Sequence, residues 1–115
     1  VYELIAGLVV ACRYGFELDN ALEIAERTYV NVNIHKKENA DKLKVLAQLP
    51  DSCAASADCL ERQREIFEAR GVFSPAMIDG ILKMLRSYDD RTLREDIGND
   101  RAQMLALVER FFHCG

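Results

Sequence analysis

Helical periodicity along nearly the whole chain is the feature that most limits what it can fold into. In most windows the apolar residues recur every three or four positions, which places them on one side of a helix with 3.6 residues per turn. Only residues 30–34 alternate between apolar and polar side chains, as a strand does. The pattern therefore predicts an all-α fold of six or seven short to medium helices, with at most one trivial edge strand.

Residues that start and stop helices divide the chain further. Pro50 ends one helix, because the residue before a proline avoids helical backbone angles, and Asp51 or Ser52 then caps the next helix. Gly71 ends that helix, and Ser74 caps another. We expect helices at residues 2–14, 19–28, 38–48, 51–70 and 74–85, a short charged turn at 90–96, and a last helix that follows residues 98–99 and includes 104–112.

The first expected helix is apolar on nearly all sides. Both faces of this helix consist of apolar or small residues. One face has Leu4, Ile5, Leu8, Val9 and Cys12, and the other has Ala6, Gly7, Val10 and Ala11. A helix of this kind needs burial on more than one side. We expect Gly15 to end it in a left-handed conformation. The later methionines, Met77, Met84 and Met104, fall on apolar faces and are interpreted as core residues.

Composition excludes several classes of function. A net charge of −4 and a pI near 5.2 argue against nucleic-acid binding, which needs a basic face. The apolar run at residues 4–12 is too short to cross a membrane and has no basic leader or cleavage site, so neither a membrane protein nor a signal peptide is expected. The chain begins at Val1 inside an apolar helix, and we expect it to be a piece of a longer protein.

Four cysteines give no sign of a disulfide framework or of a zinc site. They lie at Cys12, Cys53, Cys59 and Cys114, and none forms a CxxC pair. We interpret them as reduced thiols of a cytoplasmic protein that pack as small apolar residues. A zinc site built from His113, Cys114 and one other cysteine is the weaker alternative, because it lacks the paired spacing of zinc ligands.

Three blocks of sequence together resemble the carboxy-terminal segment of the glutamine synthetases. The first is the apolar helix at residues 2–16, in which Tyr2 stands for the tyrosine of the family's Asn-Pro-Tyr signature. The second runs from residue 33 to residue 60 and contains Leu49-Pro50-Asp51-Ser52 before a helix of alanines and leucines. The third is residues 64–78 with the corner Gly71-Val72-Phe73. The resemblance covers residues 1–95, and we interpret residues 96–115 as an added helix.

The resemblance implies that the full-length parent is a cytoplasmic, homo-oligomeric ligase of nitrogen metabolism. Glutamine biosynthesis in this family joins ammonia to glutamate with ATP, through a γ-glutamyl phosphate, and uses Mg²⁺ or Mn²⁺. The family's catalytic, phosphate-binding and metal-binding residues precede this segment. We therefore expect no catalytic, cofactor-binding or metal residue in the chain, no activity when it is alone, and packing against the rest of the catalytic domain and neighbouring subunits.

One regulatory position can be compared with the family. Some bacterial members carry an adenylylated tyrosine in the loop before Leu-Pro-x-Ser, and this chain has His35 at that place. We therefore assign no regulatory residue. A histidine can act as a ligand or pH sensor, but we interpret His35 as an exposed loop residue.

Three alternative functions are open on the sequence alone. Within the family, the parent could be a γ-glutamyl ligase for a polyamine or another amine. Outside it, the chain could be a freestanding all-α protein-interaction or oligomerisation module, which would be stable on its own and melt in two states. A small metal-binding domain is the third alternative and requires about one zinc per chain.

Overall fold

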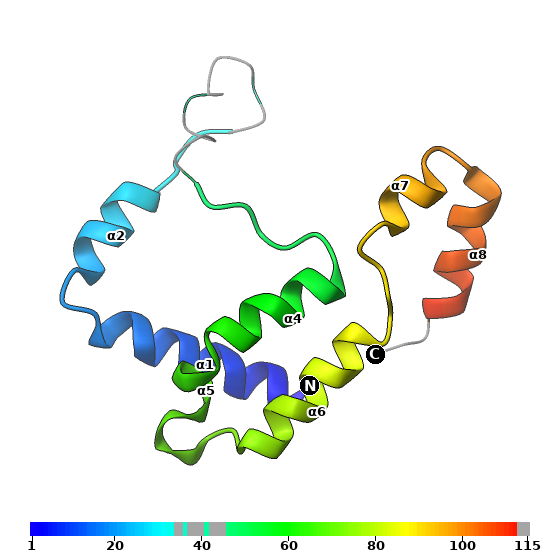
Figure 1. Ribbon diagram of the computed structural model, residues 1–115. Coiled ribbons are helices and arrows are strands. Elements are labelled where there is room, and N and C mark those ends of the chain that lie inside the picture. The colour runs from blue at the N-terminus through cyan, green and yellow to red at the C-terminus, as the bar shows by residue number, and fades with distance from the viewer. Residues whose placement is uncertain (34–35, 37–40, 42–45, 113–115) are drawn as a thin grey trace.

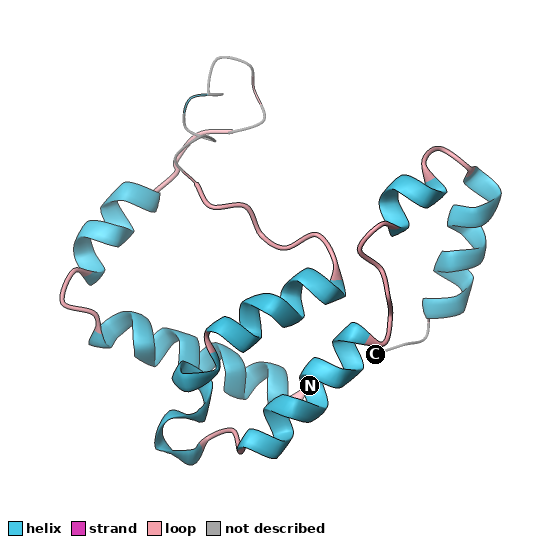
Figure 2. Ribbon diagram, in the orientation of Figure 1, coloured by secondary structure: helices cyan, strands magenta, loops and turns pink. Residues whose placement is uncertain are grey.

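The computed structural model describes residues 1–33, 36, 41 and 46–112, and within these residues it contains helices and no strand (Figures 1 and 2). This confirms the predicted all-α class. The helices, in chain order, are α1 (Tyr2–Glu17), α2 (Ala21–Thr28), α4 (Cys53–Arg62), α5 (Arg64–Glu68), the 3₁₀ turn η2 (Ala69–Gly71), α6 (Pro75–Arg86), α7 (Leu93–Ile97) and α8 (Arg101–Phe111).

Local caps fix the starts of the two central helices as predicted. The Ser52 Oγ accepts a hydrogen bond from the amide of Ala55 at 3.0 Å, at the start of α4. The Ser74 Oγ accepts one from the amide of Met77 at 3.2 Å, and Pro75 occupies the first position of α6, where its missing amide hydrogen is harmless. Asp100 caps α8 in the same way, through hydrogen bonds from Ala102 and Gln103.

Two predicted helix boundaries are wrong. Gly15 does not end α1, which continues to Glu17 and stops at Leu18, where the backbone is extended. The predicted helix at 51–70 is broken at Gln63, whose ψ of 9° is not helical. The break changes the chain direction, so that α4 packs on α6 while α5 packs on α1.

The region between α1 and α4 differs from expectation at three further points. α2 starts at Ala21 and not at residue 19, with Asn20 before it and no side-chain cap. Residues 30–33 of the expected edge strand are not in a strand, and residue 34 lies outside the described residues. The expected helix at 38–48 is mostly outside them too, and its last three residues, 46–48, are not helical.

The core lies where α4 and α6 run antiparallel and α1 crosses them with α5 (Figure 1). Ala57 of α4 faces Ile78 and Leu82 of α6, and Val10 of α1 closes the cluster. The Phe67 and Phe73 rings meet edge to face, with 6.0 Å between their centroids, on either side of the Gly71 turn. These contacts make α4, α5, α6 and the inner side of α1 one packed unit.

The remaining apolar residues are less buried than predicted. Met77, Met84 and Met104 are exposed, so their interpretation as core residues is wrong. On α8, Met104 lies on an apolar stripe that is largely exposed to solvent, and Phe111, on the same face two turns later, meets the Tyr88 ring edge to face at 5.9 Å. That solvent-facing stripe consists of Met104, Leu105, Val108 and Phe112.

The molecule is open and flat. Its radius of gyration is 17.5 Å, whereas a compact domain of this length has about 13 Å. It extends 49 × 46 × 22 Å, with α2 at one end and α7 and α8 at the other (Figure 1). It exposes 9774 Å² of surface, against roughly 6,300 Å² for a compact monomer of 13.0 kDa. The chain therefore leaves much surface that a self-contained domain would cover.

Candidate functional site

Within the described part of the chain, residues with metal-binding chemistry are not brought together. Among the residues that the structure describes, no group of three or more His, Cys, Asp or Glu side chains could hold a metal ion. Cys12 is exposed on α1, while Cys53 and Cys59 sit at different places on α4. His35, His113 and Cys114 lie outside the described residues, so the regulatory position and the alternative zinc site are not visible. In the same residues, no helix has the length and apolar character to span a bilayer.

A carboxylate from a distant loop caps the start of α4. Asp90 Oδ2 accepts a hydrogen bond from the Cys53 amide at 2.6 Å, and its Oδ1 accepts one from the Ala54 amide at 3.0 Å. Burial raises the pKa of Asp90, but these two amides outweigh that effect and hold it below its ordinary value. Burial and the nearby Asp90 carboxylate raise the pKa of the Cys53 thiol, so Cys53 is a neutral thiol and a poor nucleophile.

Two arginines, at the end of α6 and just after Asp90, bind carboxylates on the outer side of α4. Arg86 donates to Asp58 at 3.1 Å and to Glu61 at 2.6 Å, and Arg91 donates to Asp58 at 2.5 Å. The hydrogen bond from Arg91, helped by Arg86, lowers the pKa of Asp58. Arg64 and Glu68 of α5 form an ion pair at 2.7 Å with the local i,i+4 spacing of a helix. The links to Arg86 are long-range and had no local signal.

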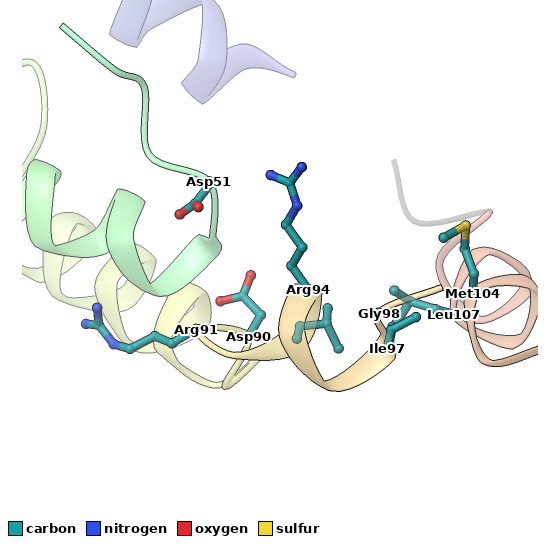
Figure 3. A pocket seen from close by; sticks show the side chains of 9 residues that line it. Asp51, Asp90, Arg91, Arg94, Ile97, Gly98, Met104 and Leu107 are labelled. Atoms are coloured by element: carbon teal, nitrogen blue, oxygen red, sulfur yellow. The ribbon is translucent and has the colours of Figure 1, made fainter. Parts of the chain in front are cut away.

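A small hollow lies between the Asp90 cap and α8, and Figure 3 shows the residues that line it. Its volume is about 220 Å³. Asp90 is already bonded to two amides and Arg91 to Asp58. The other charged side chains on its lining, Asp51 and Arg94, have opposite signs. The hollow is therefore explained by the structural cap and does not have the concentrated positive charge that a phosphate group requires.

An apolar hollow of about 540 Å³ opens between α1 and the central helices. Its walls come from α1, the α4–α5 segment and α6, and Glu3 is the one charged residue on its lining. With almost no polar group to orient a small molecule, it does not have the convergent polar contacts of a substrate site. Its lining residues are Glu3, Leu4, Gly7, Leu8, Ala11, Leu60, Phe67, Phe73, Ile78, Ile81 and Met84.

An exposed apolar stripe runs along α1 and meets the apolar hollow at Leu8. We define the α1 stripe as Ile5, Leu8, Val9, Cys12 and Phe16. Leu8 is 60% exposed, Val9 63% and Phe16 88%. The sequence predicts that this helix needs burial on more than one side, and the described residues cover it on one side, around Val10. An exposed apolar face of this length is typical of a docking surface.

Of the three charged side chains of α1, Arg13 and Glu17 are bound within the chain, and Glu3 lies on the lining of the apolar hollow. Arg13 donates to the carbonyl of Ile66 at 3.2 Å, and Glu17 accepts from Arg70 at 2.6 Å. These contacts fix α1 to α5 and η2 and leave the stripe without a charge. Among the described residues, the α1 stripe is thus the largest feature that contacts within the chain leave uncovered. Comparisons of the chain with protein-family models, with curated proteins and with solved structures find no match.

Proposed function

We propose that this chain is the carboxy-terminal helical segment of a glutamine synthetase-type ligase. The full-length parent would condense glutamate and ammonia with ATP, through a γ-glutamyl phosphate, and its catalytic domain would bind ATP and Mg²⁺ or Mn²⁺. The segment supplies no catalytic side chain. Its role is to pack against the catalytic domain and neighbouring subunits and to complete their apolar surface.

The exposed α1 stripe is the observation that carries this proposal. It lies on the helix that forms the first block of resemblance, residues 2–16. An apolar face as exposed as Leu8 and Val9 is stable in a soluble protein only when something covers it. The catalytic domain of a ligase supplies such a cover in this proposal.

The open shape supports the ligase segment over a freestanding interaction module. A module that is stable alone needs one core that buries most of its apolar side chains. Here the buried apolar residues of the described chain are few, namely Val10, Ala54, Ala57, Phe73, Ile78 and Leu82. The rest of the apolar surface is available for a larger body.

A fusion tests the proposal. The chain is joined to a glutamine synthetase catalytic domain from which the corresponding carboxy-terminal helices have been removed. ADP formation that depends on both glutamate and ammonium is then measured. We expect the fusion to be severalfold more active than the truncated domain, because the α1 stripe covers its apolar surface. The chain alone should show no such turnover.

Two matched variants show whether the stripe is responsible. Val9→Glu places a charge in the α1 stripe and should remove the gain in activity. Leu22→Glu makes the same kind of change on exposed α2 and should leave the gain intact. A fusion no more active than the truncated domain would contradict the proposal, and so would turnover by the isolated chain.

A further inference from the structure

We propose that the 115-residue chain forms a two-fold symmetric dimer in which the α1 stripes of two copies pack antiparallel. This goes beyond the proposed function, because it concerns the chain when no catalytic domain is present. The occupant of the stripe is then a second copy, and the α1 helices form the interface.

The charge distribution on α1 favours a second copy. In a two-fold interface the same patch meets itself, so any charge on the patch faces a like charge. The α1 stripe has no charged side chain, and the charges beside it, Arg13 and Glu17, are already bound by the Ile66 carbonyl and by Arg70. A partner selected by charge would find nothing to pair with on this face, whereas an identical neutral face meets no repulsion.

The spacing of side chains along α1 favours the antiparallel orientation. Val1, Ile5, Leu8, Cys12 and Gly15 follow one another at intervals of four and three residues, which is the spacing of the seam between two paired helices. Large side chains occupy the first half of this seam and small ones the second half. Antiparallel packing sets the large residues at the two ends of the seam against small ones, as close packing favours, and brings two leucines together at its centre. It pairs Ile5 with the partner's Cys12, Val1 with the partner's Gly15, and Leu8 with the partner's Leu8.

The exposed area is sufficient for a stable dimer. The chain exposes 9774 Å², and a compact monomer of its mass exposes roughly 6,300 Å². A standard stable interface buries about 800 Å² on each partner. The difference between the two surfaces is several times that value, so an interface along α1 needs only part of the surplus.

Sedimentation of the whole chain over a range of concentrations tests the dimer. We expect a reversible monomer–dimer equilibrium for the natural sequence. Leu8→Glu should raise the dissociation constant at least about tenfold, because two carboxylates then meet at the two-fold axis. Leu22→Glu on α2 should leave the dissociation constant unchanged. Far-UV circular dichroism confirms that each variant is folded.

A charge-swap experiment with Leu8→Lys tests the dimer independently if the Leu8→Glu variant fails to fold. Leu8→Lys alone should also be monomeric. An equal mixture of Leu8→Glu and Leu8→Lys chains should form a mixed dimer, because opposite charges then meet at the axis. Monomer at every concentration of the natural chain would overturn the proposal, and so would a dimer that Leu8→Glu does not weaken.

Cysteine cross-linking tests the orientation. In a background with Cys53, Cys59 and Cys114 changed to serine, Cys12 is the one thiol left. Under mild oxidation, the antiparallel dimer should give no linked product from Cys12 alone and a linked dimer when Ile5→Cys is added. Linkage by Cys12 alone, or no linkage with Ile5→Cys, would overturn the antiparallel arrangement. None of these results depends on the fusion assay, so failure of the dimer and failure of the ligase proposal are distinguishable.

Discussion

Helices α6 and α1 are both rich in apolar residues, yet only α6 buries its apolar stripe within the chain. On α6, Ile78 is 1% exposed and Leu82 5%, whereas on α1 Leu8 is 60% exposed. The difference follows from the distribution of residues around each helix. α6 has one apolar side, which α4 covers, while α1 is apolar on two sides and α5 covers one of them. The second apolar side of α1 is left uncovered by the described residues, and both proposed partners pack on it.

The largest expected effect is a loss of stability on truncating a side chain of α6, compared with the same kind of change on α1. Ile78→Ala removes a buried side chain from the α4–α6 contact and should lower the free energy of unfolding by about 2–5 kcal/mol. Val9→Ala on the α1 stripe should change it little, because Val9 faces solvent in the single chain. Urea unfolding followed by circular dichroism, at a concentration where the chain is monomeric, measures both. Equal losses for the two variants would contradict the comparison.

A smaller effect concerns the cap that fixes the start of α4 against the end of α6. Asp90→Asn replaces one carboxylate oxygen with an NH2 group, which cannot accept a hydrogen bond, so only one of the bonds from the Cys53 and Ala54 amides can be kept, and to a neutral acceptor. We expect a loss of about 1–2 kcal/mol in the free energy of unfolding at neutral pH. Thermal unfolding of the two proteins measures this loss.

The pH dependence of this loss has a definite sign. Burial raises the pKa of Asp90 in the folded chain, but the hydrogen bonds from the amides that it caps lower this pKa by more. Its contribution to stability is therefore fully present above its ordinary pKa of 3.8 and disappears as the pH falls through the lower folded-state value. The difference between the natural chain and Asp90→Asn should shrink below about pH 4. A difference that stays constant down to pH 2 would show that the charge is unimportant.

The smallest expected effects come from two glycines and have opposite signs. Gly71 has a φ of 68°, which costs side chains other than glycine free energy, so Gly71→Ala should destabilise the turn before α6 by about 1 kcal/mol. Gly15 lies inside α1 with open space around its Cα, so Gly15→Ala should stabilise α1 by roughly 0.5–1 kcal/mol. Unfolding midpoints measure both. A loss of stability in Gly15→Ala would restore the left-handed end of α1 that the sequence suggested.

Local signals made much of the fold predictable from sequence. The caps by Ser52 and Ser74 and the left-handed Gly71 depend on neighbouring residues only, and all three are found. The break at Gln63 and the passage of α1 through Gly15 were not predictable, because they depend on which helices pack together. For the same reason the exposure of the methionines was predicted incorrectly.

The candidate site was predictable only in part. The apolar character of both sides of α1 is evident in the sequence, but which side faces outward is decided by the contacts of Arg13 and Glu17 with α5 and η2. The cap by Asp90 was missed, since capping signals are sought beside the helix that they cap and this carboxylate is 37 residues away from Cys53. Long-range electrostatic contacts of this kind have no sequence signature in a single chain.

The thinness of the molecule has a consequence for how its residues tolerate change. A thickness of 22 Å is about two helix diameters, so the chain is a plate whose helices all reach a broad side. When a second protein surface packs against one broad side, the residues exposed on that side become buried. Leu8 and Val9 should then be as sensitive to truncation as Ile78, although they lie in water in the single chain.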